Sequence, residues 1–204
     1  MSTEQQNVSS VNLQRRKILT GATGVVGATG ATFLAVPFVS SWQPSEKAKA
    51  AGAPVNADVS QLQPGQMLTV AWRGKPVWIV RRTPEMINGL APLDKELRDP
   101  ASQQSEQPEY CKNPTRAVNS EYLVVVGVCT HLGCAPLYRP AIGSPDVGAD
   151  WQGGFFCPCH GSRFDLAGRV FQSVPAPTNL EIPPHHYLTD SLIRIGEDPK
   201  QGEA

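Results

Sequence analysis

The chain has 204 residues, a formal net charge of zero and five cysteines. Its neutral balance argues against a nucleic-acid partner, and its length suits one folded core of moderate size beside an N-terminal segment. The 19 prolines and 18 glycines predict a turn-rich, mostly β domain.

The N-terminal segment is expected to cross a membrane. Residues 1–14 are polar and form a predicted tail, and Arg15 and Arg16 then precede residues 18–39, which carry no charge. As a helix, that run would reach about 33 Å, enough to cross a bilayer core of about 30 Å. Positive charge at its start predicts a cytoplasmic N-terminus.

The twin arginines before an apolar run resemble a Tat signal, which exports proteins already folded around a cofactor. A cleaved signal peptide is the alternative, because Ala48-Lys49-Ala50 fits a small-x-small cleavage site. The apolar run is longer than a signal's usual apolar region, which favours a retained anchor over residues 15–39. Residues 40–58, rich in Ala, Pro, Ser, Lys and Gly, are then a predicted hinge linker.

The folded domain is expected over residues 59–197, with a tail at 198–204. Alternating or continuous apolar patterns predict strands at 67–71, 77–81, 122–128, 151–156, 164–165, 170–171 and 192–195. Residues 73–76 are the predicted turn between the first two strands. Residues 84–120 are polar and charged, and we expect a short helix at 84–90 and otherwise an exposed excursion.

Two short boxes follow the strands at 122–128 and 151–156. The first reads Cys129-Thr130-His131-Leu132-Gly133-Cys134, and the second reads Cys157-Pro158-Cys159-His160-Gly161-Ser162. Each box offers one cysteine and one histidine at close spacing, and each holds a second cysteine. The boxes therefore supply four metal ligands and one disulfide's worth of spare cysteines, leaving Cys111 as an expected buried, inert thiol.

Three kinds of site fit these residue types. A zinc site of the Cys2His2 type needs the same ligand count, although zinc fingers place their two cysteines together and their two histidines together. Two disulfides with incidental histidines leave unexplained why two of the chain's four histidines lie in the boxes. A box that mixes the two residue types suits a two-iron cluster, in which one iron takes both thiolates and the other takes both imidazoles.

At these boxes the sequence resembles the Rieske iron–sulfur proteins, the known case of such mixed ligation. The resemblance implies one [2Fe–2S] cluster, with Cys129 and Cys157 on one iron and His131 and His160 on the other. It also implies a disulfide between Cys134 and Cys159, which favours an oxidising compartment such as the bacterial periplasm. Ser162 is then placed to donate a hydrogen bond to a cluster sulfur.

A second resemblance covers residues 63–83, from Gln63-Pro64-Gly65-Gln66 to Arg81-Arg82-Thr83, which look like the basal domain of quinol-oxidising Rieske subunits. The implied fold is a single transmembrane helix, a hinge linker and an antiparallel β head. In that head a small cluster-binding subdomain, about 128–180, is inserted in a basal β domain. Val174-Pro175-Ala176-Pro177 matches the family's proline-rich loop over the cluster. His185 and His186 follow prolines, and we expect them at the surface.

The implied function is that of the iron–sulfur subunit of a quinol–cytochrome c reductase, a respiratory translocase. The cluster would take an electron from ubiquinol at cytochrome b and pass it to a c-type cytochrome, with His160 accepting the quinol proton. The family also implies a dimeric complex in the cell inner membrane, with the cluster head in the periplasm. The alternatives are a small Rieske subunit of a periplasmic oxidase, similar to arsenite oxidase, and a soluble Rieske ferredoxin.

Overall fold

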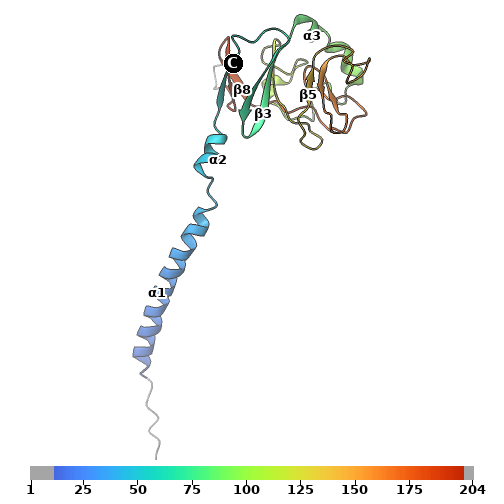
Figure 1. Ribbon diagram of the computed structural model, residues 1–204. Helices are drawn as coiled ribbons and strands as arrows, with labels where there is room; N and C mark the ends of the chain where they lie inside the picture. Colours follow the sequence, from blue (N-terminus) through green and yellow to red (C-terminus); the bar gives the residue numbers. More distant parts are fainter. Residues whose placement is uncertain (1–11, 200–204) are drawn as a thin grey trace, which may run out of the picture. The chain divides into compact units, whose positions relative to one another are not determined.

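The computed structural model describes residues 12–199 (Figure 1). Residues 1–11 and 200–204 lie outside the described part, and with them most of the tails predicted at 1–14 and 198–204. The chain divides between Lys49 and Ala50 into two units, each of which is described by itself.

The first unit is dominated by one helix, α1 (Leu13–Ser40), of 28 residues. It begins at Asn12, whose side chain accepts a hydrogen bond from the Arg15 amide, and none of its residues is buried within the unit. By length and composition it is able to cross a membrane. The threonine hydroxyls of Thr23 and Thr29 donate to carbonyls four residues earlier, which satisfies polar groups that lipid would leave unpaired.

The second unit is mostly β, as expected, and holds three antiparallel sheets of three strands each. The first sheet contains β1 (Val55–Asp58), β9 (Leu192–Ile195) and β8 (His185–Thr189), in that order. The second contains β2 (Met67–Trp72), β3 (Lys75–Arg81) and β4 (Tyr122–Val126). The third contains β5 (Leu137–Arg139), β6 (Gly154–Phe156) and β7 (Arg163–Phe164), so this small sheet is inserted in the chain between strands of the other two.

The second sheet lies between the other two and has both faces buried. On one face Trp78 and Val80 of β3 pack against residues of the third sheet, and Phe155 stacks on Trp78 with ring centroids 5.3 Å apart. On the other face Ile79 and Val124 pack against the first sheet. Because successive side chains of a strand point to opposite faces, burial of both faces produces the continuous apolar run seen in β4.

The hairpin between β2 and β3 has a shorter turn than predicted. Only Arg73 and Gly74 form it, with φ of 50° and 72°, whereas the prediction included Lys75 and Pro76. Two consecutive residues with positive φ match the twist of a two-residue hairpin, so the strands pair up to Trp72 and Lys75. Local sequence rules overestimated the turn because proline is unusual inside a strand.

Other strand limits differ from the predictions by a few residues. The strand expected at 122–128 ends at Val126, and that expected at 151–156 begins at Gly154. The last strand, at 192–195, is confirmed by β9. The linker expected at 40–58 contains α2 (Glu46–Ala51) and β1, whose Val55 already pairs with Ile195 of β9.

The segment at 84–120 contains the expected short helix, α3 (Pro84–Asn88), capped by Thr83, and two 3-10 turns, η1 (Ala91–Glu96) and η2 (Glu109–Cys111). The prediction that the rest is exposed was wrong. Leu97, Cys111 and Arg116 are buried, and Cys111 belongs to the largest hydrophobic cluster. Burial raises the pKa of the Cys111 thiol to about 11, which fits the expected inert cysteine.

Three buried arginines explain how a polar segment can pack inside. Arg82 donates to the carbonyls of Thr115, Ser120 and Leu166, and Arg116 donates to those of Ala167, Gly168 and Leu180. These loop carbonyls lie outside the sheets, so the guanidinium groups supply the donors that strands would otherwise supply. Burial lowers the pKa of both Arg82 and Arg116 to about 10, well above neutrality.

The third buried arginine, Arg169, is paired with a buried carboxylate. Its Nε donates to Asp165 Oδ2 at 2.7 Å, and both side chains are almost fully shielded from solvent. Its other nitrogens donate to Asp94 Oδ1 and the Leu90 carbonyl. Arg169 therefore joins η1 to the chain that follows β7.

His185 and His186 are buried, so the prediction of surface histidines was wrong. The prolines lie just before the strand, so the two histidines are the first residues of β8 rather than part of a loop. The His185 amide donates to the Tyr110 hydroxyl at 3.0 Å, and its Nδ1 lies 2.9 Å from the Pro183 carbonyl oxygen. Desolvation lowers the pKa of His185, which keeps this imidazole neutral inside the domain.

Candidate metal centre

The two boxes fold into loops with the same backbone hydrogen bonds. In the first, the Cys129 amide donates to the Cys134 carbonyl at 2.8 Å and the Gly133 amide donates to the Cys129 carbonyl at 3.0 Å. In the second, the Cys157 amide donates to the Ser162 carbonyl at 2.8 Å, and the Gly161 amide donates to the Cys157 carbonyl at 2.9 Å.

Both closing glycines have positive φ, 81° at Gly133 and 74° at Gly161. That conformation is unfavourable for other residues, which explains why each box carries a glycine at its fifth position. The first loop lies between β4 and β5, and the second joins β6 to β7. Pairing of β5 with β6 brings the two loops side by side.

The loops place two free thiols together in the core. Cys129 and Cys157 are both buried and unpaired, and they lie close enough to interact directly. Burial raises the pKa of the Cys129 thiol, and the neighbouring Cys157 raises it further. Two adjacent thiolates in such a place need a positive partner, and a thiolate-binding metal provides one.

The remaining pair, Cys134 and Cys159, forms a disulfide across the loops, with Cα atoms 6.7 Å apart. The expected pairing is thereby confirmed. The sulfurs of Cys134, Cys157 and Cys159 all lie within 4.8 Å of one another. This proximity does not make those three a ligand set, since two of the sulfurs are already bonded to each other. Within the two boxes the free thiols are those of Cys129 and Cys157.

The two box histidines meet beside the thiols. The His131 and His160 rings have centroids 4.7 Å apart and lie nearly perpendicular, at 88°. His131 is half-buried and His160 is exposed, whereas both free cysteines are buried. The four predicted ligands thus come together with sulfur inside and imidazole outside. The donor set of two thiols and two imidazoles fits a [2Fe–2S] group with mixed ligation.

The proline-rich loop at 174–177 and the next residue, Thr178, are hydrogen-bonded to the two boxes. Ala176 is buried, and its amide donates to Ser162 Oγ at 3.1 Å. The Thr130 hydroxyl of the first box donates to the Thr178 carbonyl at 2.7 Å. Sequence reasoning did not single out Thr130, although a hydroxyl between two ligand positions is a signal that a loop contact is available.

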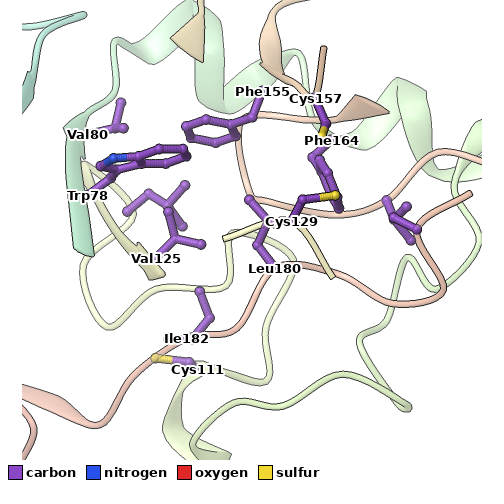
Figure 2. Packing of buried hydrophobic residues seen from close by; sticks show 13 residues of the cluster. Trp78, Val80, Cys111, Val125, Cys129, Phe155, Cys157, Phe164, Leu180 and Ile182 are labelled. Carbon is purple, nitrogen blue, oxygen red and sulfur yellow. The ribbon is translucent and has the colours of Figure 1, made fainter. Parts of the chain in front are cut away.

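Aromatic packing closes the inner side of the centre (Figure 2). The Phe164 ring lies beside Cys129 and Cys157 in the same buried cluster, whereas Cys111 lies at the opposite end of that cluster in this view. The Ser162 hydroxyl lowers the pKa of the Cys129 thiol and so opposes the effect of burial. The predicted site residue Ser162 is therefore next to sulfur.

Comparison with known proteins gives one family for both ends of the chain. A family model described as "Rieske [2Fe-2S] domain" matches residues 53–184, and one described as "Ubiquitinol-cytochrome C reductase Fe-S subunit TAT signal" matches residues 5–45. The first match includes both boxes and the proline-rich loop. The second includes the twin arginines and all of α1.

Whole-chain relatives agree with these matches. The chain is 61% identical over 192 residues to the ubiquinol-cytochrome c reductase iron-sulfur subunit of Allochromatium vinosum, covering 94% of this chain and 93% of that protein. It is 41% identical over 182 residues to the protein of the same name from Blastochloris viridis, covering 89% and 92%. A solved structure described as "Hyperthermophilic respiratory Complex III" is similar at 30% identity and a TM-score of 0.47, covering 86% of this chain and 98% of that chain.

Proposed function

This chain belongs to the Rieske [2Fe-2S] iron–sulfur subunits of ubiquinol–cytochrome c reductase, and we propose that Cys129, Cys157, His131 and His160 hold its cluster. One observation carries this assignment. The paired loops hold two free buried thiols and two imidazoles whose ring centroids lie 4.7 Å from each other. The cofactor is therefore an iron–sulfur cluster rather than zinc. The chain is a membrane-anchored subunit of an oxidoreductase complex.

The cluster, when bound, supplies a one-electron acceptor whose potential is raised because neutral imidazoles replace two anionic thiolates. His160, the exposed imidazole, is proposed to meet the hydroxyl of ubiquinol and to accept its proton on the ring nitrogen that does not bind iron. The buried cysteines exclude water from the sulfur side. Electron and proton transfer are thereby coupled at one exposed edge.

The partners follow from the family. We assign the quinol pocket largely to a cytochrome b subunit and the onward acceptor to a c-type cytochrome subunit, within a dimeric complex. Helix α1 would cross the inner membrane once, with the N-terminus in the cytoplasm and the cluster head over residues 59–197 in the periplasm. The uncharged run and its preceding twin arginines support this orientation.

Copurification tests this proposal. The protein should be solubilised from membranes with a mild detergent and isolated through a C-terminal tag, and the accompanying proteins and haems should be identified. Haem-containing b- and c-type partners are expected in fixed ratio. Release without detergent, or copurification with a molybdenum-containing large subunit, would instead favour the soluble ferredoxin or the periplasmic oxidase.

The disulfide between Cys134 and Cys159 is expected to stabilise the cluster loops. Closing a loop with this separation of 25 residues would contribute roughly 3–4 kcal/mol by chain entropy alone. Since the cluster already joins the same loops, the Cys134→Ser variant should retain some cluster and lose it at a lower temperature. Heating while recording visible absorption measures this loss.

The double variant Cys134→Ser/Cys159→Ser is the matched control, because it removes the thiol that the single variant leaves free. It should behave like the single variant. An unchanged temperature of cluster loss in both would show that the disulfide contributes nothing beyond the cluster.

Substitutions at Ser162 and Phe164 are expected to shift the reduction potential of the cluster in opposite directions. Many high-potential relatives carry a tyrosine where this chain has Phe164, so we expect a potential below the upper limit of about +300 mV. Donors near sulfur stabilise the reduced state, and one hydrogen bond is worth on the order of 1 kcal/mol, or several tens of millivolts for one electron. Ser162→Ala should lower the potential, and Phe164→Tyr should raise it.

Voltammetry of the two variants beside the parent measures these shifts. A Phe164→Tyr potential equal to that of the parent would mean that a hydroxyl on this buried ring does not reach a ligand sulfur.

A further inference from the structure

The proline-rich loop and its two flanks, residues 172–180, cover the boxes and are called the lid here. Its inner side contacts the boxes through Ala176, whose amide donates to Ser162 Oγ, and through Thr178, whose carbonyl accepts from Thr130. Its outer side is bonded to residues 95–105, called the brace. The brace belongs to the segment that sequence analysis expected to be exposed.

The two arms of the lid are attached to the brace differently. The second arm is held by Asn179, which is buried and donates to the Asp99 carbonyl and to Ser102 Oγ, both at 2.9 Å. Its Oδ1 also accepts from the Val170 amide at 2.8 Å. Several buried hydrogen bonds thus fix this arm in place.

The first arm lies over an open hollow of about 530 Å³. The hollow is lined by Lys95, Glu96, Gly161, Arg163, Phe171, Gln172, Ser173 and Val174. Ser173 has a φ of 58°, which is unusual for a residue other than glycine. Gln172 and Ser173 are exposed and only Val174 packs against the buried cluster, so the arm is held largely by its hydrogen bonds to the brace.

Two residues provide those bonds. The Gln172 amide donates to the Glu96 carbonyl at 2.8 Å, at the start of the arm. Arg98 Nη2 donates to the Val174 carbonyl at 2.9 Å, nearest to the prolines. The Arg98 guanidinium group therefore fixes the backbone of Val174, the last residue of the arm before Pro175.

A displacement of Val174 would be transmitted through the loop to the hydrogen bond beside the cluster. Pro175 and Pro177 restrict the backbone on both sides of Ala176, so the loop moves as a stiff unit. The Ala176 amide donates to the hydroxyl oxygen of Ser162, the residue expected to donate to a cluster sulfur. Successive hydrogen bonds polarise one another, so losing the first donor weakens the second.

We propose that Arg98 is a positioning residue, a latch that holds the lid against the second box and thereby keeps the Ser162 hydroxyl in place beside the cluster. The latch rests on the proposed cluster and on the role of Ser162 as a donor to one of its sulfurs. Through this latch the brace, which is remote from both boxes in sequence, would influence the reduction potential of the cluster.

The test compares Arg98→Gln with Lys95→Met in the full chain, purified with its complex in detergent. Lys95 lines the same hollow and carries the same charge, but no side-chain hydrogen bond to the lid is seen for it within residues 12–199, so it controls for charge alone. Amide hydrogen exchange of the lid peptide should be about fivefold faster in Arg98→Gln. The reduction equilibrium should fall about threefold, which is about 28 mV at 59 mV per tenfold.

Arg98→Lys, which can still donate to the Val174 carbonyl, should restore much of both properties. Unchanged lid exchange in Arg98→Gln would overturn the latch, and so would equal potential shifts in Arg98→Gln and Lys95→Met. Faster exchange throughout β3 and β4 would also overturn it, since that indicates general destabilisation. Absence of a Rieske signal in the parent would instead refute the proposed ligands.

Discussion

Replacing Cys157 with alanine is expected to abolish the cluster. The variant removes one of two thiolates from one iron, and no other thiol stands ready to replace it. The sulfurs of Cys134 and Cys159 are bonded to each other, and Cys111 lies at the other end of the buried cluster. Electron paramagnetic resonance of membranes reduced with ascorbate should show the Rieske signal in the parent and none in the variant.

His160→Ala should have the same outcome, because it leaves the second iron with a single imidazole. Cys111→Ala is the matched control: it removes an equally buried thiol that we place outside the ligand set, and the signal should persist. A Rieske signal in Cys157→Ala, or its loss in Cys111→Ala alone, would require a different set of ligands.

Replacing Arg169 with methionine is expected to be the most destabilising change away from the cluster. The substitution leaves the Asp165 carboxylate buried without its guanidinium partner, which was 2.7 Å away. Removing one member of a buried ion pair typically costs about 3–5 kcal/mol in the free energy of unfolding. The Asp94 and Leu90 contacts to η1 are lost as well.

Chemical denaturation, followed by the visible absorption of the cluster, measures this loss as a lower midpoint. Arg139→Met is the matched control, since it breaks the exposed pair with Asp146 and should shift the midpoint far less. Similar midpoints for the two variants would show that Asp165 retains enough backbone donors, from Ala167 and Arg169, to remain charged without the side chain.

The site was largely predictable because its chemistry is local. Each box places its ligands, its spare cysteine and its closing glycine within six residues, so the residue types alone restrict the possible metals. The strands around the boxes were also recognisable, since burial of β4 on both faces leaves a continuous apolar run. Strands β1, β5 and β8 were missed, the strand expected at 170–171 forms only isolated bridges, and other strand limits were misplaced. Pairing with a distant partner determines these features.

The brace and the buried arginines were not predictable in the same way. Arg116 looks like a surface residue in sequence, and its burial depends on carbonyls of Ala167 and Leu180, which lie far along the chain. His185 likewise becomes buried through Tyr110. Local composition carries no information about such distant hydrogen-bond partners, so a polar segment was taken for an exposed one.

The central claim is that this chain carries electrons from quinol to a c-type cytochrome. The most direct measurement follows the Rieske signal of the isolated complex by electron paramagnetic resonance as substrates are added in turn. Ubiquinol should reduce the oxidised cluster, and added oxidised c-type cytochrome should then remove the signal. A complex with a full complement of cluster that remains oxidised in excess ubiquinol would contradict the account.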